Sequence, residues 1–401
     1  MQGSVYWRLS GFYFFYFSVL GTMGPYFPLY LKSLGLSAWP IGFLIAVMAG
    51  TKIIAPNIWG WLADHSGQRM TVIRLGCLMA VLPFLFLWQQ QQSLWILAAI
   101  IFLYSFFWNA VLAQFEAVTL LYLRKTPERY SRVRLWGSAG FIVAVAGAGW
   151  LFDRIPISFF PVLVTLALLA IFVSSCLVSD PVEPDVAALP AQASPSFWQR
   201  LRNPSIALFF FVCFLMVLSH GAYYTFFSLL MEQFQRSHTV IGLLWGLGVV
   251  AEMILFWYMH KLLPFWGVRS LLLICLAATT ARWLLLALFP QSMPIMLFAQ
   301  CLHALSFAGF HAGAIETVRR LFAIQQSGKA QAFYSAVGYG AGNSLGALLS
   351  GAIWHWGYVW PFVVSALVCA LAFLLVWRYL PDAFFSGVAS TENNLLRTLR
   401  R

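Results

Sequence analysis

The polar stretch GWLADHSGQR, residues 60–69, separates two apolar runs at about 40–62 and 71–88. Each run holds the ~20 mostly apolar residues that a helix needs to cross a bilayer. Gly67 permits a tight turn between the runs, and Asp64 can pair with a nearby cation or cap a helix N-terminus. The stretch therefore predicts two spanning helices joined by a short polar loop at one membrane surface.

The same alternation recurs outward from this loop and predicts an all-α membrane protein of twelve transmembrane helices in two six-helix bundles. The expected spans are about 9–31, 40–62, 71–88, 94–118, 133–152, 157–178, 205–231, 239–260, 268–289, 293–318, 330–353 and 358–380. No small-residue cleavage site follows the first run closely, so we expect it to stay as a helix. The bundles would cover residues 1–178 and 205–381, with a polar linker at 179–204 and a disordered tail at 382–401.

Composition places this chain in lipid. Of its 401 residues, 61% are hydrophobic and 9% are charged. A soluble domain of this length could not bury that much apolar surface. The net charge of +12 is a weak sign of nucleic acid binding, because the basic residues sit in short loops. The 6 cysteines lie inside apolar runs without a CxxC pair, so we expect no disulfide framework and no metal site.

The basic residues also predict orientation. Of 24 Lys and Arg residues, only Lys32, Arg154 and Arg236 fall on one predicted side, and Lys52 and Arg282 fall within spans. The remaining basic residues share the other side, which the positive-inside rule assigns to the cytoplasm. Both termini are therefore expected inside, in a multi-pass protein of a bacterial inner membrane.

The two halves of the chain resemble each other at an offset of 200 residues. This offset relates loop glycines and rare intramembrane charges, which coincidence between apolar sequences explains poorly. The matches are Ser37, Ile41 and Gly42 with Ser237, Ile241 and Gly242; Gly67 and Arg69 with Gly267 and Arg269; Glu116 with Glu316; and Lys52 with Glu252. Parallel six-helix repeats are typical of transporters that bind substrate near mid-membrane.

The loop at residues 60–69 resembles the G-x-x-x-D-x-x-G-x-R loop of the major facilitator superfamily, through Gly60, Asp64, Gly67 and Arg69. The second copy has Pro264 in place of the acid. The resemblance covers nearly the whole chain. It implies a major facilitator fold, alternating access, and a cytoplasmic gate formed by the four matching residues.

Further resemblances point to one branch of that superfamily. Glu116 and Arg134 are similar to the acid and arginine of the lactose permease branch that pair with each other and with sugar. The stretches 219–224 and 245–252 look more like the phenylpropionate permease group, which implies carriage of small aromatic acids with protons. At helix 10 this chain keeps His303 but has Ser306 where lactose permease has its proton-carrying glutamate, so sugar transport is in doubt.

Ionisable residues inside a bilayer are costly and are functional candidates by default. We expect proton coupling to involve Glu252, His303, His311, Arg282 and Glu316. A structural ion pair between Glu252 and Arg282 is the alternative for that acid. Each histidine can instead be an ordinary hydrogen-bonded core residue. Glu316 can pair locally with Arg319 and Arg320, three and four residues later.

A second group of residues is expected to bind substrate. Lys52 and Arg134 would hold a carboxylate, beside Glu116 and an aromatic surface. The aromatic candidates are Trp136, Tyr223, Tyr224 and Trp245. As alternatives, Lys52 can neutralise Glu116 or Glu252, and Arg134 can be a loop charge.

These features favour proton-coupled uptake of a small organic acid, such as an aromatic carboxylate, by a transporter that is monomeric and uses no cofactor beyond the proton. A sugar or nucleoside symporter and a drug-efflux antiporter remain alternatives. A channel is disfavoured by the repeat and the gate loop. No nucleophile–base pair, HExxH motif or phosphate loop indicates an enzyme.

Overall fold

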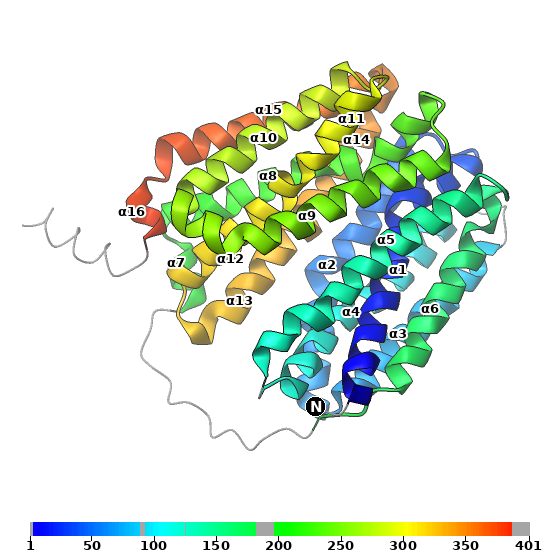
Figure 1. The fold of residues 1–401 in the computed structure, drawn as a ribbon, viewed down its shortest axis with the longest axis horizontal. Coiled ribbons are helices and arrows are strands. Elements are labelled where there is room, and N and C mark those ends of the chain that lie inside the picture. Colours follow the sequence, from blue (N-terminus) through cyan, green and yellow to red (C-terminus); the bar gives the residue numbers. More distant parts are fainter. Residues whose placement is uncertain (1–2, 89–92, 125, 182–195, 387–401) are drawn as a thin grey trace, which may run out of the picture. The chain divides into compact units, whose positions relative to one another are not determined.

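The computed structural model describes residues 3–88, 93–124, 126–181 and 196–386. All regular structure in these residues is helical, as predicted (Figure 1). The first half contains α1 (Gly3–Ser33), α2 (Ala38–Ser66), α3 (Arg69–Leu85), α4 (Leu94–Tyr122), α5 (Tyr130–Phe152) and α6 (Phe160–Cys176). The second half contains α7 (Phe197–Leu201), α8 (Pro204–Gln233), α9 (His238–Trp266), α10 (Val268–Leu288), α11 (Met293–Cys301), η4 (Ala304–Gly309), α12 (Phe310–Leu321), α13 (Ile324–Ser335), η5 (Ala336–Gly342), α14 (Asn343–Ile353), α15 (Val359–Tyr379) and α16 (Asp382–Phe385). Short 3-10 turns η1 (Phe86–Trp88), η2 (Pro127–Arg129), η3 (Ile157–Phe159) and η6 (Trp354–Trp356) join or extend them.

Within the described residues, 10 helices are long and apolar enough to cross a membrane. They coincide with ten of the predicted spans. The two other predictions, 9–31 and 330–353, fall on α1 and on the α13–η5–α14 segment. Both are helical but less apolar: α1 includes Pro25 and Pro28, and α13 reads IQQSGKAQAFYS.

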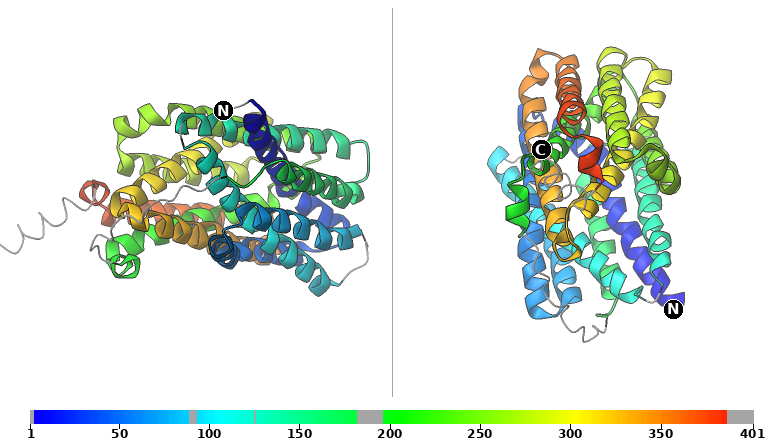
Figure 2. Two further views of the ribbon diagram at one scale, coloured as in Figure 1. Left: turned by 90° about the horizontal axis from the view of Figure 1, so that it is seen from below. Right: turned by 90° about the vertical axis from the view of Figure 1, so that its left-hand side faces the viewer.

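The first-half helices pack closely as a bundle. α1 lies against α5 and α6, α3 against α4 and α6, and α2 against α4; Figure 2 shows these blue-to-green helices side by side. Glycine makes the α1–α5 contact possible, because a Cβ at Gly21 would lie 2.6 Å from the Phe141 carbonyl oxygen. Small residues let two helix backbones approach at such a distance.

The chain divides into two compact units. Unit 1 comprises residues 1–187, 223–246 and 347–355, and unit 2 comprises 188–222, 247–346 and 356–401. Unit 1 thus joins the first half to the ends of α8, α9 and α14. Within unit 1, the repeat-related residues Gly42 and Gly242 both lie against the backbone of another helix, Gly42 against Ala347 and Gly242 against Val145.

Unit 2 is built around α10, which packs against α15, α12 and η4. η4 and η5 are π-helical turns inside longer helices, a feature that often marks functional sites. Short helices occur in the predicted linker and tail, α7 and α16 respectively; residues 182–195 and 387–401 of those segments lie outside the described residues. Four cysteines are buried, whereas Cys176 and Cys301 are exposed.

Candidate functional site

A buried acid–histidine pair is the most distinctive polar feature of unit 2. The Glu252 Oε1 atom, on α9, lies 2.7 Å from the Nε2 atom of His303, and the two side chains are only 13% and 6% exposed. Gly248, one turn before Glu252, makes room for the ring, since a Cβ there would lie 3.0 Å from the His303 Cδ2 atom. The sequence predicted both residues but not that they would pair.

Arg282 of α10 contacts the other side of the same histidine. Its Nη1 atom lies 2.8 Å from the His303 Nδ1 atom and donates to the Ser306 hydroxyl at 3.0 Å. Its Nε atom donates to the Ala299 carbonyl at 3.0 Å. The guanidinium side chain is fully buried, so these acceptors replace water around a fixed charge. The predicted Glu252–Arg282 association therefore runs through His303.

His220 of α8 borders this cluster. Its Nδ1 atom donates to the Met216 carbonyl at 2.8 Å, and its ring lies 6.4 Å from that of His303 and 4.9 Å from that of Trp283. His220 is not among the proton-coupling residues that the sequence predicts.

The second predicted histidine joins a different hydrogen-bond group. The His311 Nδ1 atom lies 3.2 Å from the Tyr334 hydroxyl and 3.4 Å from that of Tyr339 in η5. Phe307 stacks on the rings of both His303 and His311, so the three rings lie on one side of the helix. Their different partners give them different chemistry.

Glu316 lies in a local salt bridge. Its carboxylate accepts from Arg319 Nε at 2.6 Å and from Arg320 Nε at 2.7 Å. This is the local pairing that the sequence offered as the alternative to a proton-coupling role. The carboxylate thus joins successive turns of α12.

The predicted Glu116–Arg134 pair forms in unit 1. Arg134 Nε lies 3.9 Å from Glu116 Oε1, with both side chains about one-third exposed, 32% and 37% respectively. The guanidinium also lies 4.0 Å from the centre of the Phe17 ring. Arg134 is inside α5, so the alternative of a loop charge is wrong.

Lys52 differs from the other intramembrane charges. It lies on α2, half-buried, beside Thr51, whose hydroxyl accepts from Asn109 at 2.8 Å. Among the described residues of unit 1, no ion pair to Lys52 is found, Glu116 included. A cation held in a spanning helix without an anion is suited to receiving one from a ligand.

The predicted aromatic residues separate into two places in unit 1. Tyr223 and Trp245 are buried with ring centres 4.6 Å apart, and Tyr224 lies 6.2 Å from Trp245. Trp136 instead donates to the Tyr6 hydroxyl at 3.0 Å, near the start of α1.

The loop at residues 60–69 has the predicted turn and ion pair. Gly67 ends α2 with a φ of 65°, in the left-handed region that favours glycine. Arg69 binds Asp64 at 2.7 Å and Gln114 of α4 at 3.1 Å. Gly60 faces Gln114 as well, with room for a Cβ 3.5 Å from its Nε2 atom. The loop thus ties α2 and α3 to α4.

Residues 6–364 match the family described as MFS_1 like family. This chain belongs to the MFS_1-like family. It is 28% identical to a probable 3-phenylpropionic acid transporter of Escherichia coli (strain K12), over 94% of this chain and 99% of the relative. It is 26% identical to a maltose permease of Geobacillus stearothermophilus, over 91% and 93%. The predicted resemblance to the major facilitator superfamily and its phenylpropionate permease group is confirmed.

Solved structures support the same fold for this MFS_1-like protein. The nucleoside transporter NupG, as its D323A mutant, aligns with a TM-score of 0.82 at 15% identity, covering 94% of this chain and 100% of that one. The POT family transporter PepTSo aligns with a TM-score of 0.76 at 11% identity, over 94% of this chain and 98% of that one. The protein is therefore a multi-pass membrane transporter of the major facilitator superfamily.

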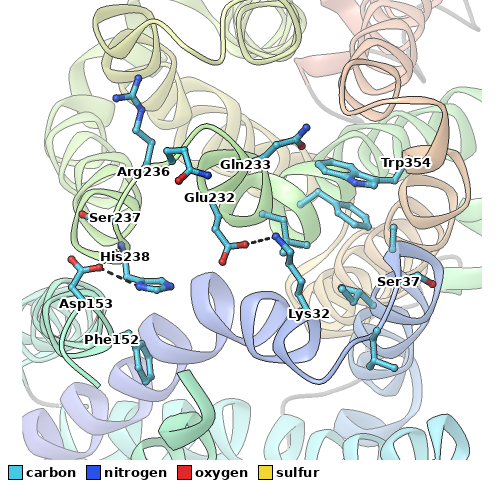
Figure 3. A pocket seen from close by; sticks show the side chains of 16 residues that line it. Lys32, Ser37, Phe152, Asp153, Glu232, Gln233, Arg236, Ser237, His238 and Trp354 are labelled. Carbon is cyan, nitrogen blue, oxygen red and sulfur yellow. Dashed lines mark hydrogen bonds and ion pairs between the residues drawn. The ribbon is translucent and has the colours of Figure 1, made fainter. Parts of the chain in front are cut away.

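Sequence reasoning missed a polar pocket in unit 1 of this MFS_1-like transporter. The pocket has a volume of about 990 Å³, and Lys32 Nζ pairs inside it with Glu232 Oε2 at 2.7 Å (Figure 3). Lys32 and Glu232 are 200 residues apart, so the repeat offset contained a signal that could have found them.

Asp153, at the end of α5, caps the N-terminus of α9 beside the same pocket. It accepts from the backbone N–H groups of His238, at 2.7 Å, and Thr239, at 3.0 Å. Partial burial alone raises the pKa of Asp153, but the hydrogen bonds from the Thr239 side chain and backbone and from His238 outweigh it and hold the pKa below its usual value. Local sequence carried no signal for this cap between distant helices.

Proposed function

We propose that this transporter couples proton entry to uptake of a small aromatic carboxylate across a bacterial inner membrane. The observation that carries the proposal is the Glu252–His303 pair, buried inside unit 2 and linked to Arg282. The relative named as a probable 3-phenylpropionic acid transporter supports an aromatic acid as the substrate class.

Glu252 is the proposed proton site. A carboxyl group can be charged or neutral, whereas the neighbouring guanidinium is always charged. Binding a proton at Glu252 therefore changes the charge of a site from which water is largely excluded, and charge is what a bilayer interior penalises most. Such a group can link an imposed proton gradient to a change of conformation.

Lys52 is the proposed anchor for the carboxylate of the substrate. Charge-assisted hydrogen bonds from a lysine to a carboxylate are short and strong, and Lys52 makes no ion pair with the residues of unit 1 that the structure describes. Glu116 and Arg134, with the aromatic residues Tyr223, Tyr224, Trp245 and Trp136, complete the proposed binding residues.

The membrane arrangement belongs to the same proposal. We infer twelve spans, with α1 and the α13–η5–α14 segment added to the apolar helices, and both termini in the cytoplasm. The distribution of Lys and Arg supports this orientation. The transporter is proposed to act as a monomer, without cofactor, by alternating access.

The test is uptake into liposomes under an imposed pH gradient, with labelled 3-phenylpropionate as the first substrate. Wild-type protein should accumulate the acid when the interior is alkaline. Glu252→Gln should lose accumulation yet keep exchange of labelled for unlabelled substrate. Glu128→Gln, the same chemical change in the exposed η2 turn, is the matched control and should accumulate normally. Normal accumulation by Glu252→Gln would refute the assignment.

Sugar symport is the second candidate, favoured by the maltose permease relative. A neutral sugar would not need the cation at Lys52. Competition against labelled 3-phenylpropionate by maltose and by benzoate separates the two: competition by maltose alone would favour the sugar.

A further inference from the structure

We propose that Arg282 holds His303 as the neutral ring with its hydrogen on Nε2, so that His303 positions Glu252 but never carries the coupled proton. The proposal deepens the proposed proton symport and rests on it for the identity of the coupled ion. It assigns one carrier among the acid and histidines of unit 2.

The first step is the direction of the bond between Arg282 and His303. A guanidinium has only N–H donors and no acceptor. The Arg282 Nη1 atom lies 2.8 Å from the His303 Nδ1 atom, so Nδ1 must present its lone pair. A hydrogen on Nδ1 would point at another hydrogen across this short distance.

Ser306 contacts the same ring nitrogen at a longer distance than Arg282 does. The Ser306 hydroxyl donates to the His303 carbonyl at 3.1 Å and accepts from Arg282 Nη1 at 3.0 Å. Its Oγ atom lies 3.4 Å from His303 Nδ1. The Nη1 group of Arg282 carries two hydrogens and thus faces both the hydroxyl oxygen and the ring nitrogen, which both act as acceptors toward it.

The second step concerns the opposite ring nitrogen. A neutral imidazole with a bare Nδ1 carries its hydrogen on Nε2. That atom lies 2.7 Å from Glu252 Oε1 and donates to it. The hydrogen bonds therefore run in one direction, from Arg282 through His303 to Glu252.

The groups that contact the ring come from several helices. From α8, the neighbour is His220, which donates its Nδ1 hydrogen to Met216. From α10 the charged neighbour is Arg282, from α9 it is Glu252, and on its own helix His303 stacks on Phe307. A second proton on His303 would place an imidazolium directly against the fixed guanidinium, which opposes it.

The entering proton consequently bonds to Glu252. It forms an O–H bond at Oε2, while Oε1 keeps accepting from His303 Nε2–H, and no proton passes to or from the ring. His303 is a positioning residue that orients the carboxyl group and separates it from Arg282. This separation explains why a neutral ring lies between the carboxylate of Glu252 and the guanidinium of Arg282.

The direct test is the tautomer of His303 in the full-length protein. ¹⁵N-histidine-labelled protein in lipid nanodiscs is examined by long-range ¹H–¹⁵N spectra over roughly pH 5.5–8.5, where an unperturbed histidine titrates. His303→Gln identifies the signal by its loss. We expect a protonated Nε2 and a bare Nδ1 throughout. A hydrogen on Nδ1, or an imidazolium within this range, would overturn the proposal.

Arg282→Met tests the cause. Without the arginine donors, the His303 ring should bind a second proton, on Nδ1, as the pH falls, because the Glu252 carboxylate remains beside it. If the His303 ring of this variant stays neutral over the same pH range, Arg282 is not what keeps it neutral. If this variant does not fold, the wild-type tautomer still decides the proposal.

Transport separates a positioning role from a carrier role. His303→Gln should slow gradient-driven uptake of 3-phenylpropionate and move its pH profile toward higher pH, because the carboxylate loses a well-placed donor, but some accumulation should remain. Complete loss of accumulation with intact exchange, as expected for Glu252→Gln, would make His303 a carrier. If wild-type protein takes up no aromatic acid, the proposed function fails, while the tautomer measurement still stands.

Discussion

Glu252 and Arg282 differ in the property that matters most for a group inside a bilayer. A carboxyl group becomes neutral when it binds a proton, whereas a guanidinium does not lose its charge. Glu252, which can become neutral, lies at one end of a chain of contacts through His303. Arg282, whose charge is fixed, lies fully buried at the other end. The chemistry proposed for this transporter follows from that order.

Lys52 supplies a prediction at the same scale. Lys52→Ala should weaken binding of 3-phenylpropionate roughly 10- to 100-fold, because a hydrogen bond to a charged group contributes about 1.5–3 kcal/mol. Isothermal titration in detergent measures the dissociation constant. Lys52→Arg keeps the charge and should lose less affinity. An unchanged constant for Lys52→Ala would exclude it as the anchor.

Glu316 gives the contrasting prediction for an intramembrane acid. Its two arginine contacts lie at helical spacings of three and four residues, and such pairs contribute about 0.2–0.5 kcal/mol each. Glu316→Gln should therefore lower the melting temperature slightly and leave proton-driven accumulation intact. Loss of accumulation together with an unchanged melting temperature would instead support the predicted role of Glu316 in proton coupling.

At the scale of helices, the π-helical turn η4 separates His303 from His311, and the sequence did not predict the hydrogen-bond partners of either residue. The 3.6-residue period correctly predicts that His303 and His311 share a side, but the turn over Ala304–Gly309 changes the local winding. The partner of each histidine therefore depends on packing against α9, α10 and η5. The spans, the turn and ion pair at residues 60–69, and the Glu116–Arg134 pair were predictable because local spacing or a motif indicates them.

The cap of α9 was not predictable, because Asp153 and His238 are 85 residues apart and no local pattern links them. Asp153→Ala should cost about 0.5–2 kcal/mol of stability, the usual cost of losing an N-cap side chain. A thermal melt in nanodiscs at neutral pH measures it. An unchanged melting temperature would show that the cap contributes nothing.

The same cap predicts a pH dependence. The pKa of Asp153 is lower in the folded protein than its usual value of 3.8, so its stabilisation is complete above about pH 4 and is lost as pH falls through the folded value. Asp153→Asn should therefore melt below wild type at pH 7 and approach it near pH 3. A constant difference across that range would contradict the assignment.

At the scale of the whole molecule, the internal repeat is the main organising feature. It relates Lys32 to Glu232, which pair within unit 1, and Lys52 to Glu252, which have opposite charge and separate proposed roles. The repeat thus supplies equivalent positions, and the side chains at those positions differ in charge and in proposed role. The offset was readable from sequence, but which equivalent residues meet required the structure.

The Lys32–Glu232 pair allows a test of that symmetry. Because the two side chains are 51% and 37% exposed, their coupling should stay within about 0.2–1 kcal/mol. Lys32→Glu and Glu232→Lys should each lower stability slightly, and the double swap should restore it. A double variant no better than the sum of the single ones would exclude a direct interaction.

The most direct test of the central claim is proton movement driven by substrate. Proteoliposomes receive an inward gradient of 3-phenylpropionate without a pH gradient, in weakly buffered medium, and external pH is recorded with a proton-permeable ionophore as control. Wild-type protein should make the medium more alkaline as substrate enters, and Glu252→Gln should admit substrate by exchange without any pH change. Substrate entry through wild-type protein with no alkalinisation would contradict proton symport.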